Sequence, residues 1–246
     1  MENLTHGVVE WVKNFFCDHG QTKAVIGISG GKDSAVVAAI CVSALGRENV
    51  YGVLMPCGVQ KDISDSYAVV KHLNIDYIVA NIGDAFNDIS ALIPQFNISY
   101  NAKTNLPSRL RMCTLYAYAQ SIGAMVANTC NLSEDIVGYS TLYGDSAGSF
   151  APLSRLTTEE VIQIGTDLKL PDSIVHKTPV DGLQPKTDEE KLGFTYHELN
   201  ELIRKNKKGR NYERIMELYH ANKFKTEIIR IPCYDPCLTN YFEKKV

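Results

Sequence analysis

The stretch Lys23-Ala-Val-Ile-Gly-Ile-Ser-Gly-Gly-Lys-Asp-Ser34 sets the fold of this chain. Its first half is a short apolar run rich in β-branched side chains, which predicts a strand. Gly30 and Gly31 predict a tight turn, and the apolar stretch from Asp33 to Leu45 predicts a helix. At such a junction, exposed backbone N–H groups and the helix dipole both favour an anionic ligand. The sequence therefore predicts a phosphate-binding loop between a strand and a helix.

The same strand-then-helix pattern recurs three more times. The predicted pairs are 50–55 with 64–73, 76–80 with 83–92, and 124–128 with 133–138. Four alternations imply a parallel sheet with helices on both faces. We therefore expect an α/β fold with a Rossmann-like, doubly wound parallel sheet. In such a sheet the loops that follow the strands gather at one edge, where ligands bind.

The rest of the chain adds polar loops and further helices. A polar segment at 97–107 is expected to be extended and to lead into a helix at 108–122, with Pro107 near its first turn. Further helices are predicted after the capping box Thr157-x-x-Glu160, at 196–205 and at 212–224. These helices would lie around the sheet and close the chain.

The composition excludes several classes of protein. The 246 residues are 45% apolar and carry a net charge of -3, which is typical of a globular domain and provides no general attraction for nucleic acid. No apolar run approaches the ~20 residues that span a bilayer, and no signal pattern opens the chain. The seven cysteines are scattered, which indicates reduced thiols of a cytoplasmic protein. Without a repeat or a composition break, we expect a single domain over residues 1–246, with neither nucleic acid nor membrane as partner.

The glycine-rich loop is not a Walker A motif. That motif requires Gly at position 26 and Ser or Thr at position 33, where this chain has Ile26 and Asp33. The string Ser29-Gly-Gly-Lys-Asp-Ser34 resembles instead the pyrophosphate-binding loop of the ATP pyrophosphatases, which cut ATP between its α and β phosphates and so adenylate a substrate. The resemblance implies ATP contacts at Gly27, Ile28, Ser29, Gly30, Gly31, Lys32, Asp33 and Ser34. The alternative is an ordinary glycine-rich turn.

Two acidic residues are candidate magnesium ligands and catalytic residues. Asp33 could simply cap the helix, but by the resemblance it holds Mg²⁺, a metal that proteins bind with one or two carboxylates plus substrate phosphates. Glu134 follows the fourth predicted strand, and its loop should converge on the glycine-rich loop at the same sheet edge. Glu134 is therefore the natural second ligand. The alternative for Glu134 is a solvated residue at a helix start.

Three later blocks narrow the resemblance to one family. Asn105-Leu-Pro-Ser-Arg-Leu-Arg-Met112, the run from Asn128 to Asp145, and Lys186-Thr-Asp-Glu-Glu-Lys-Leu-Gly193 are similar to the corresponding parts of ammonia-dependent NAD+ synthetases. Order and spacing match from Lys23 to about Lys225. The resemblance implies further ATP contacts at Gln60, Thr129 and Thr158 and deamido-NAD+ contacts at Arg109, Tyr139, Asp145, Ser149 and Lys225. It also implies a homodimer.

Some of these residues have other interpretations. Arg109 and Arg111 are two positions apart in a predicted helix and cannot both face one site. Tyr139 could be a core residue, because aromatic side chains bury a large area without any ligand. Where the family has Lys, Asp, Lys, and Ser or Thr, this chain has Leu142, Ser149, Thr158 and Val180. These departures bear on the acid substrate, whereas the ATP and metal loops are intact.

The resemblance implies a two-step amidation. The nicotinate carboxylate of deamido-NAD+ attacks the α-phosphorus of Mg-ATP, pyrophosphate leaves, and ammonia displaces AMP to give NAD+. Free ammonia is the expected donor, because a glutaminase needs its own Cys nucleophile and normally its own domain. The rivals are a paralogous ligase that amidates another carboxylic acid and a non-catalytic nucleotide-binding sensor. Asp33 and Glu134 argue against the sensor, because binding alone would not need both carboxylates.

Overall fold

The computed structural model of the chain describes residues 4–60, 62–92, 98–177, 187–228 and 231–236. At its centre is a parallel sheet with the strand order β3-β2-β1-β4. The strands are β1 (Ala24–Gly27), β2 (Val50–Leu54), β3 (Asp76–Val79) and β4 (Met125–Val126). In the register, Val25 of β1 faces Tyr51 of β2 and Val126 of β4. The predicted parallel α/β sheet is confirmed.

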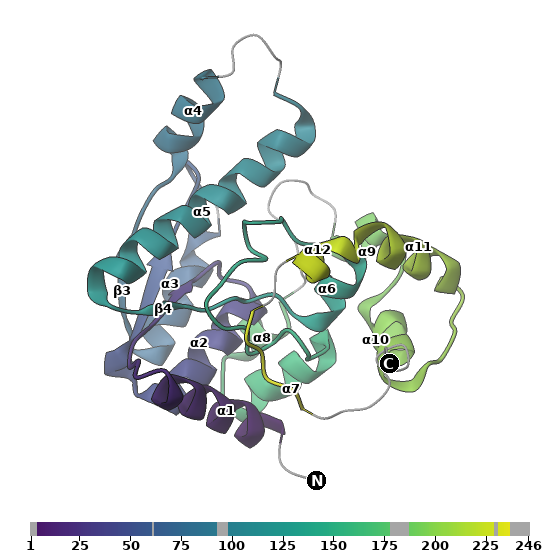
Figure 1. The fold of residues 1–246 in the computed structure, drawn as a ribbon, viewed down its shortest axis with the longest axis horizontal. Helices are drawn as coiled ribbons and strands as arrows, with labels where there is room; N and C mark the ends of the chain where they lie inside the picture. Colours follow the sequence, from purple (N-terminus) through teal and green to yellow (C-terminus); the bar gives the residue numbers. More distant parts are fainter. Residues whose placement is uncertain (1–3, 61, 93–97, 178–186, 229–230, 237–246) are drawn as a thin grey trace.

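Helices cover both faces of this sheet (Figure 1). Their bounds are α1 (Leu4–Asp18), α2 (Lys32–Leu45), the 3-10 helix η1 (Arg47–Asn49), α3 (Ile63–Leu73), α4 (Gly83–Ala91), α5 (Tyr100–Ile122), α6 (Leu132–Val137), α7 (Thr158–Asp167), α8 (Asp172–Val175), α9 (Asp188–Leu192), α10 (Tyr196–Lys205), α11 (Tyr212–Asn222) and α12 (Phe224–Ile228). Helix α2 packs on one face together with α1, α3 and α7, and α5 packs on the other. The sheet is therefore doubly wound, as predicted.

Strand β1 is one of the two inner strands, and its side chains divide the core into two layers. Ala24 and Ile26 are buried in the cluster formed with α1, α2 and α7, whereas Val25 is buried with Met112 and Leu115 of α5. Successive side chains of a strand point to opposite faces, so this alternation anchors β1 from both sides. The glycine-rich loop thus starts from one of the most firmly held points of the fold.

The segment before Pro107 differs from the expectation of an extended loop. Helix α5 begins at Tyr100, so Pro107 lies inside the helix and not at its first turn. Ser99 is the N-cap of α5, because its Oγ accepts a hydrogen bond from Ala102 N at 3.2 Å. The polar composition of the segment gave no sign of this helix start. The buried Pro107 lacks the N–H that would pair with the carbonyl of Lys103, a loss that packing of the helix outweighs.

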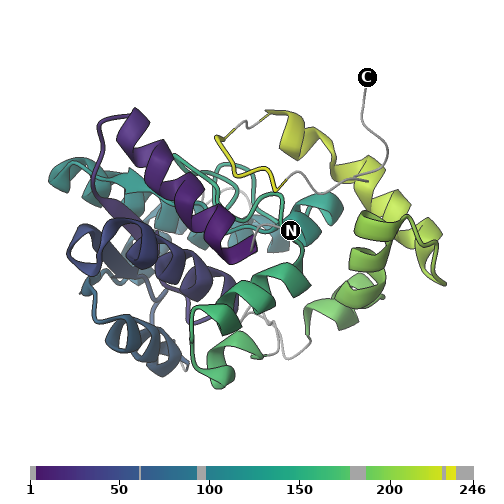
Figure 2. The same ribbon diagram turned by 90° about the horizontal axis from the view of Figure 1, so that it is seen from below.

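The last helices form a separate layer beside the sheet. Helices α6, α9, α10 and α11 contribute to their own apolar cluster, and Figure 2 shows the green and yellow C-terminal helices on the side away from the blue α3. The helix expected at 212–224 ends at Asn222, and the short α12 follows it. Helix α10 contacts both α6 and α7, which brings it close to the strand-end loops. Within the described ranges, no helix combines the length and apolar character needed to cross a bilayer.

Candidate active site

The glycine-rich loop leads directly from β1 into α2. Its backbone turns at Gly30, where φ is +82° and an added Cβ would lie 2.9 Å from the backbone nitrogen of Ser66. Glycine is therefore required there both for conformation and for space. Ser29 Oγ accepts a hydrogen bond from Gly31 N at 3.2 Å, and Ser34 Oγ donates to Gly31 O at 3.1 Å. These hydrogen bonds from Ser29 and Ser34 fix the backbone of the loop beside the first turn of α2.

Asp33 is not the cap of α2. The helix begins at Lys32 with Gly31 in the N-cap position, so the capping alternative for Asp33 is wrong. The carboxylate is instead held from two sides, because Lys32 Nζ donates to Asp33 Oδ2 at 2.8 Å and Asn131 Nδ2 donates to Oδ1 at 2.9 Å. The second of these contacts joins the loop after β1 to the loop after β4.

Glu134 belongs to the capping box of α6. Asn131 Oδ1 accepts from Glu134 N at 3.1 Å, and Glu134 Oε2 accepts from Asn131 N at 3.2 Å. Asn131 therefore bonds to both Asp33 and Glu134, which brings together the two acidic residues that the sequence singled out. Glu134 is half-buried and has a structural role at the start of α6, so its expected role as a metal ligand stays a prediction.

Charge is tightly balanced around this pair. Burial, together with the nearby charge of Asp33, raises the pKa of Glu134 well above its usual range despite the opposing charge of Lys32. Burial alone would lower the pKa of Lys32, but Asp33, Glu134 and Asp188 outweigh it and raise that pKa. Lys32 therefore stays protonated between carboxylates that repel one another.

These carboxylates fit a magnesium ion that substrate phosphates help to bind. Among the described residues, no group of three or more His, Cys, Asp or Glu side chains forms a complete metal cage. Mg²⁺ does not need one, because it is commonly held by one or two carboxylates, waters and phosphate oxygens. Burial is the main cause of the raised pKa of Glu134 and the charge of Asp33 adds to it, so a cation held by these residues would favour the ionised form of Glu134.

The residues expected near deamido-NAD+ make many contacts within the chain. Tyr139 packs against the apolar cluster of α6, α9, α10 and α11, and its Oη donates to Asp188 Oδ1 at 2.9 Å, so the core interpretation stays open. Asp145 Oδ1 accepts from Ser108 Oγ at 2.6 Å and from Thr141 N at 2.9 Å, which fixes the loop before Asp145 against α5. These bonds orient the loop around Tyr139 and leave its expected role in substrate binding a prediction.

The side chains of Lys225 and Ser149 also form hydrogen bonds with backbone groups. Lys225 Nζ donates to Gly138 O at 2.7 Å and to Ser140 O at 2.9 Å, and burial lowers its pKa. Ser149 Oγ accepts from Val126 N at 3.2 Å, so its hydroxyl completes the end of β4. Lys225 lines a cavity of about 520 Å³ whose other polar walls include Asn128, Asp135, Ser140, Arg155 and Arg204.

The two arginines of α5 point in different directions, as their spacing predicted. Arg109 is exposed and its Nε donates to Leu142 O at 3.1 Å, whereas Arg111 Nε donates to Met55 O at 3.0 Å. Arg111 is mostly buried, and this burial lowers its pKa. Which of the two contacts substrate stays a prediction.

The remaining expected ATP residues lie on different elements. Gln60 follows β2 and its Nε2 donates to Asp62 Oδ1 at 3.1 Å, while Thr129 is half-buried in the loop after β4. Thr158 is the first residue of α7 and is buried. Val180 lies outside the described residues.

Several site residues escaped the sequence analysis. Asn131 had a usable signal, because an Asn three positions before a Glu at a helix start is a capping box. Asp188, Tyr196 and Asn200 lie on α9 and α10, beyond the strand-end loops, and no motif marked Tyr196 or Asn200. A second cavity of about 390 Å³ is lined by Lys32, Thr158, Tyr196 and Asn200, among others.

Comparison with known proteins identifies the family. A family model described as NAD synthase matches residues 4–231, which include the glycine-rich loop and both acidic residues. The chain belongs to the NAD synthase family. This membership confirms the family expected from the sequence, an ATP-dependent family of amide ligases.

Relatives within the NAD synthase family match most of the chain. The NH(3)-dependent NAD(+) synthetase of Pyrococcus horikoshii is 40% identical over 197 residues, 80% of this chain and 76% of that protein. The one of Archaeoglobus fulgidus is 34% identical over 236 residues, covering 92% and 95%. The alignments thus extend well beyond the ATP loop.

Two solved structures share the fold of the chain. The NMN synthetase of Francisella tularensis has a TM-score of 0.86 and 31% identity, covering 93% of this chain and 97% of that one. The NH3-dependent NAD synthetase of Campylobacter jejuni has a TM-score of 0.74 and 26% identity, covering 93% and 96%. The fold class expected from the sequence is therefore confirmed a second time.

Proposed function

We propose that this chain is an ammonia-dependent NAD+ synthetase. It adenylates the nicotinate carboxylate of deamido-NAD+ with ATP and amidates the product with ammonia, giving NAD+, AMP and pyrophosphate. The observation that carries the proposal is the bridge from Asn131 to Asp33 and Glu134, at 2.9 Å to Asp33 Oδ1, which places two carboxylates beside the glycine-rich loop. Family membership supplies the reaction class.

The chain's own groups would act mainly through charge and position. Lys32, whose Nζ is 2.8 Å from Asp33 Oδ2, would attract the ATP phosphates together with the N–H groups at the start of α2. Asp33 and Glu134 would hold Mg²⁺, which when bound neutralises charge on the phosphates. Fixed donors and charges of this kind provide much of the transition-state stabilisation in such reactions. No protein nucleophile is needed.

A homodimer and a cytoplasmic location belong to the same proposal. Tyr77 and Val79 on the edge strand β3 and Leu92 after α4 are large apolar side chains exposed to solvent, which supports a contact with a second copy. Six cysteines of the described part of the chain are free thiols, which is consistent with a reducing compartment.

A second acid substrate, nicotinate mononucleotide, has specific support. The structure of the Francisella tularensis NMN synthetase matches with a TM-score of 0.86, against 0.74 for the Campylobacter jejuni NAD synthetase. Leu142 and Ser149 also lack the charges that the resemblance led us to expect at these positions. The Ser149 hydroxyl accepts a hydrogen bond from Val126 N of β4. The cavity beside Lys225 could thus serve a mononucleotide.

The test is substrate-dependent pyrophosphate release by the purified chain with Mg-ATP. Deamido-NAD+, nicotinate mononucleotide and other carboxylic acids are supplied separately, each with ammonium or with ammonia-free glutamine. We expect amide formation from deamido-NAD+ with ammonium, and a rate at subsaturating ammonium that rises with pH because only neutral ammonia has the attacking lone pair. Preference for nicotinate mononucleotide would establish the second candidate, and activity with neither would refute both.

Two variants test the metal assignment. Asp33→Asn and Glu134→Gln should each lose most turnover while circular dichroism shows an intact fold, because each keeps the shape of the side chain and removes its charge. Wild-type turnover in either variant would show that the carboxylate concerned has no role in the reaction.

A further inference from the structure

The cavity beside Lys32 is lined by buried hydrogen-bonding groups that lack a partner. Thr158 Oγ1, Tyr196 Oη and Asn200 Nδ2 are buried, and none of them has a hydrogen-bond partner among the described residues. The four residues Lys32, Thr158, Tyr196 and Asn200 all line this cavity and are only 3–6% exposed. A buried polar group without a partner is costly and rare in native proteins. Three such groups in one cavity point to a ligand.

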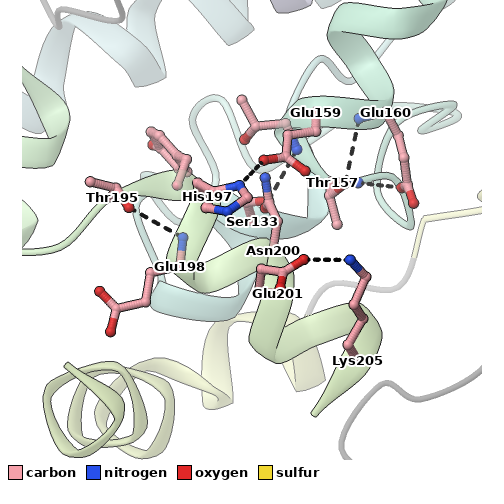
Figure 3. Close-up of polar contacts among 12 residues, drawn as sticks. Ser133, Thr157, Glu159, Glu160, Thr195, His197, Glu198, Asn200, Glu201 and Lys205 are labelled. Atoms are coloured by element: carbon pink, nitrogen blue, oxygen red, sulfur yellow. Dashed lines mark hydrogen bonds and ion pairs between the residues drawn. The ribbon is translucent and has the colours of Figure 1, made fainter. Parts of the chain in front are cut away.

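Neighbouring hydrogen bonds fix the direction of Asn200 (Figure 3). Ser133 Oγ accepts from Thr158 N at 3.1 Å and donates its own hydrogen to Asn200 Oδ1 at 2.7 Å. Because Ser133 is the donor in the second contact, the carbonyl oxygen of Asn200 faces Ser133 and the NH₂ group is left for the cavity. Ser133 of α6, held by the first residue of α7, therefore orients a donor that belongs to α10.

Four of the side chains that line the cavity can donate hydrogen bonds. Lys32 contributes an ammonium group, Thr158 and Tyr196 contribute hydroxyls, and Asn200 contributes an amide NH₂. Two glutamates also line the cavity, but both already bond to α10: Glu159 Oε1 contacts His197 Nδ1 at 2.7 Å, and Glu189 Oε1 accepts from Tyr196 N at 2.8 Å. A ligand with several negatively charged oxygens matches this arrangement, since charge-assisted hydrogen bonds are the strong ones.

We propose that Tyr196 and Asn200 bind the pyrophosphate part of ATP, the group that leaves during adenylation, together with Thr158 and Lys32. The proposal rests on the proposed function in that pyrophosphate is its product. Lys32 places the cavity next to the glycine-rich loop, and Tyr196 lies close enough to Glu134 and Asp33 for their charges to act on its hydroxyl. Neutral donors of α10 would thus complete a phosphate site in which position 158 has a hydroxyl and not an ammonium group.

The test measures binding of inorganic pyrophosphate with Mg²⁺ to the full chain, by calorimetry and without acid substrate. Tyr196→Phe and Asn200→Ala should each weaken binding about two- to tenfold, the loss of one hydrogen bond. Tyr196→Phe should at the same time leave the melting temperature of the ligand-free protein unchanged or higher, because it removes a buried hydroxyl without a partner. A purely structural role would lower the melting temperature instead.

Matched controls come from the same chain. Tyr116→Phe changes a tyrosine that packs against the α5 face of the sheet, and Asn222→Ala removes an amide that donates to Val137 O and Leu218 O, away from this cavity. Wild-type pyrophosphate affinity in Tyr196→Phe and Asn200→Ala, or equal losses in the controls, would overturn the inference. Weakened pyrophosphate binding without NAD+ synthesis would overturn the proposed function alone.

Discussion

Asn131 is the residue whose replacement tests the site most directly. Its side chain is fully buried and has two tasks: Oδ1 caps α6 through Glu134 N, and Nδ2 donates to Asp33 Oδ1 at 2.9 Å. Asn131→Ser separates them, because serine is an equally good N-cap but cannot reach Asp33 with an NH₂ group. Asn131→Asp keeps both the cap and the volume and replaces the donor with an oxygen.

The expected magnitudes follow from these contacts. A hydrogen bond to an ionised carboxylate contributes about 1.5–3 kcal/mol, so Asn131→Ser should lower the free energy of unfolding by about that amount, plus a smaller term for lost packing. Two like charges 2.9 Å apart repel by roughly 6 kcal/mol at an effective dielectric constant of about 20, before relaxation or protonation. Asn131→Asp should therefore be less stable than Asn131→Ser although it is the closer mimic in shape.

Urea unfolding followed by circular dichroism, without ligands and near neutral pH, measures both changes. Turnover should fall about ten- to hundredfold in Asn131→Ser if the hydrogen bond to Asp33 is used in full to position the carboxylate during adenylation. An Asn131→Asp variant as stable as the wild type would refute the inference that Nδ2 donates to an ionised Asp33.

Three other perturbations have definite outcomes. Gly30→Ala should lower stability by about 1–3 kcal/mol and weaken ATP binding, measured by urea unfolding and calorimetry, because φ is +82° there. Lys177→Met removes partly exposed ion pairs to Asp62 and Asp65, so the free energy of unfolding at pH 7 should fall by less than about 1 kcal/mol. Burial alone would raise the pKa of Asp62, but its hydrogen bonds to Gln60 and Lys177 outweigh burial and lower that pKa. The loss of stability caused by Lys177→Met should therefore disappear as the pH falls through the lowered pKa and Asp62 becomes protonated. Burial raises the pKa of Cys41 to about 12, so native-state iodoacetamide labelling should modify exposed Cys17 and spare Cys41.

The sequence could predict the parallel sheet and the meeting of two loops. Both inferences depend on rules that are local or topological: β-branched runs before helices form parallel strands, and the loops after those strands share one edge. Asp33 and Glu134 each lie on the segment that directly follows a strand, so their proximity could be predicted without any knowledge of packing. In the structure the two loops do meet, through the hydrogen bond from Asn131 to Asp33.

Other features depended on tertiary packing. Pro107 and its polar neighbours suggested an extended loop, but Ser99 caps the helix and Met112 and Leu115 of α5 pack against the sheet, so the helix forms around the proline. Tyr196 and Asn200 lie on a helix far along the chain from the strand ends. Their position depends on how α10 packs against α6 and α7, which hydrophobic periodicity alone does not specify.

The raised pKa of Glu134 beside Asp33 could not have been predicted from the sequence either. A glutamate three residues after a helix cap is normally solvated and ionised, and its pKa is close to that of a free side chain. Here the fold places a half-buried Glu134 beside Asp33, and burial is the main reason that the pKa of Glu134 is raised. Ionising both carboxylates adds a repulsion that Lys32 does not fully offset. A divalent cation bound together with substrate phosphates would cancel it. The repulsion built into the ligand-free site would then favour binding of the cation that the proposed reaction requires.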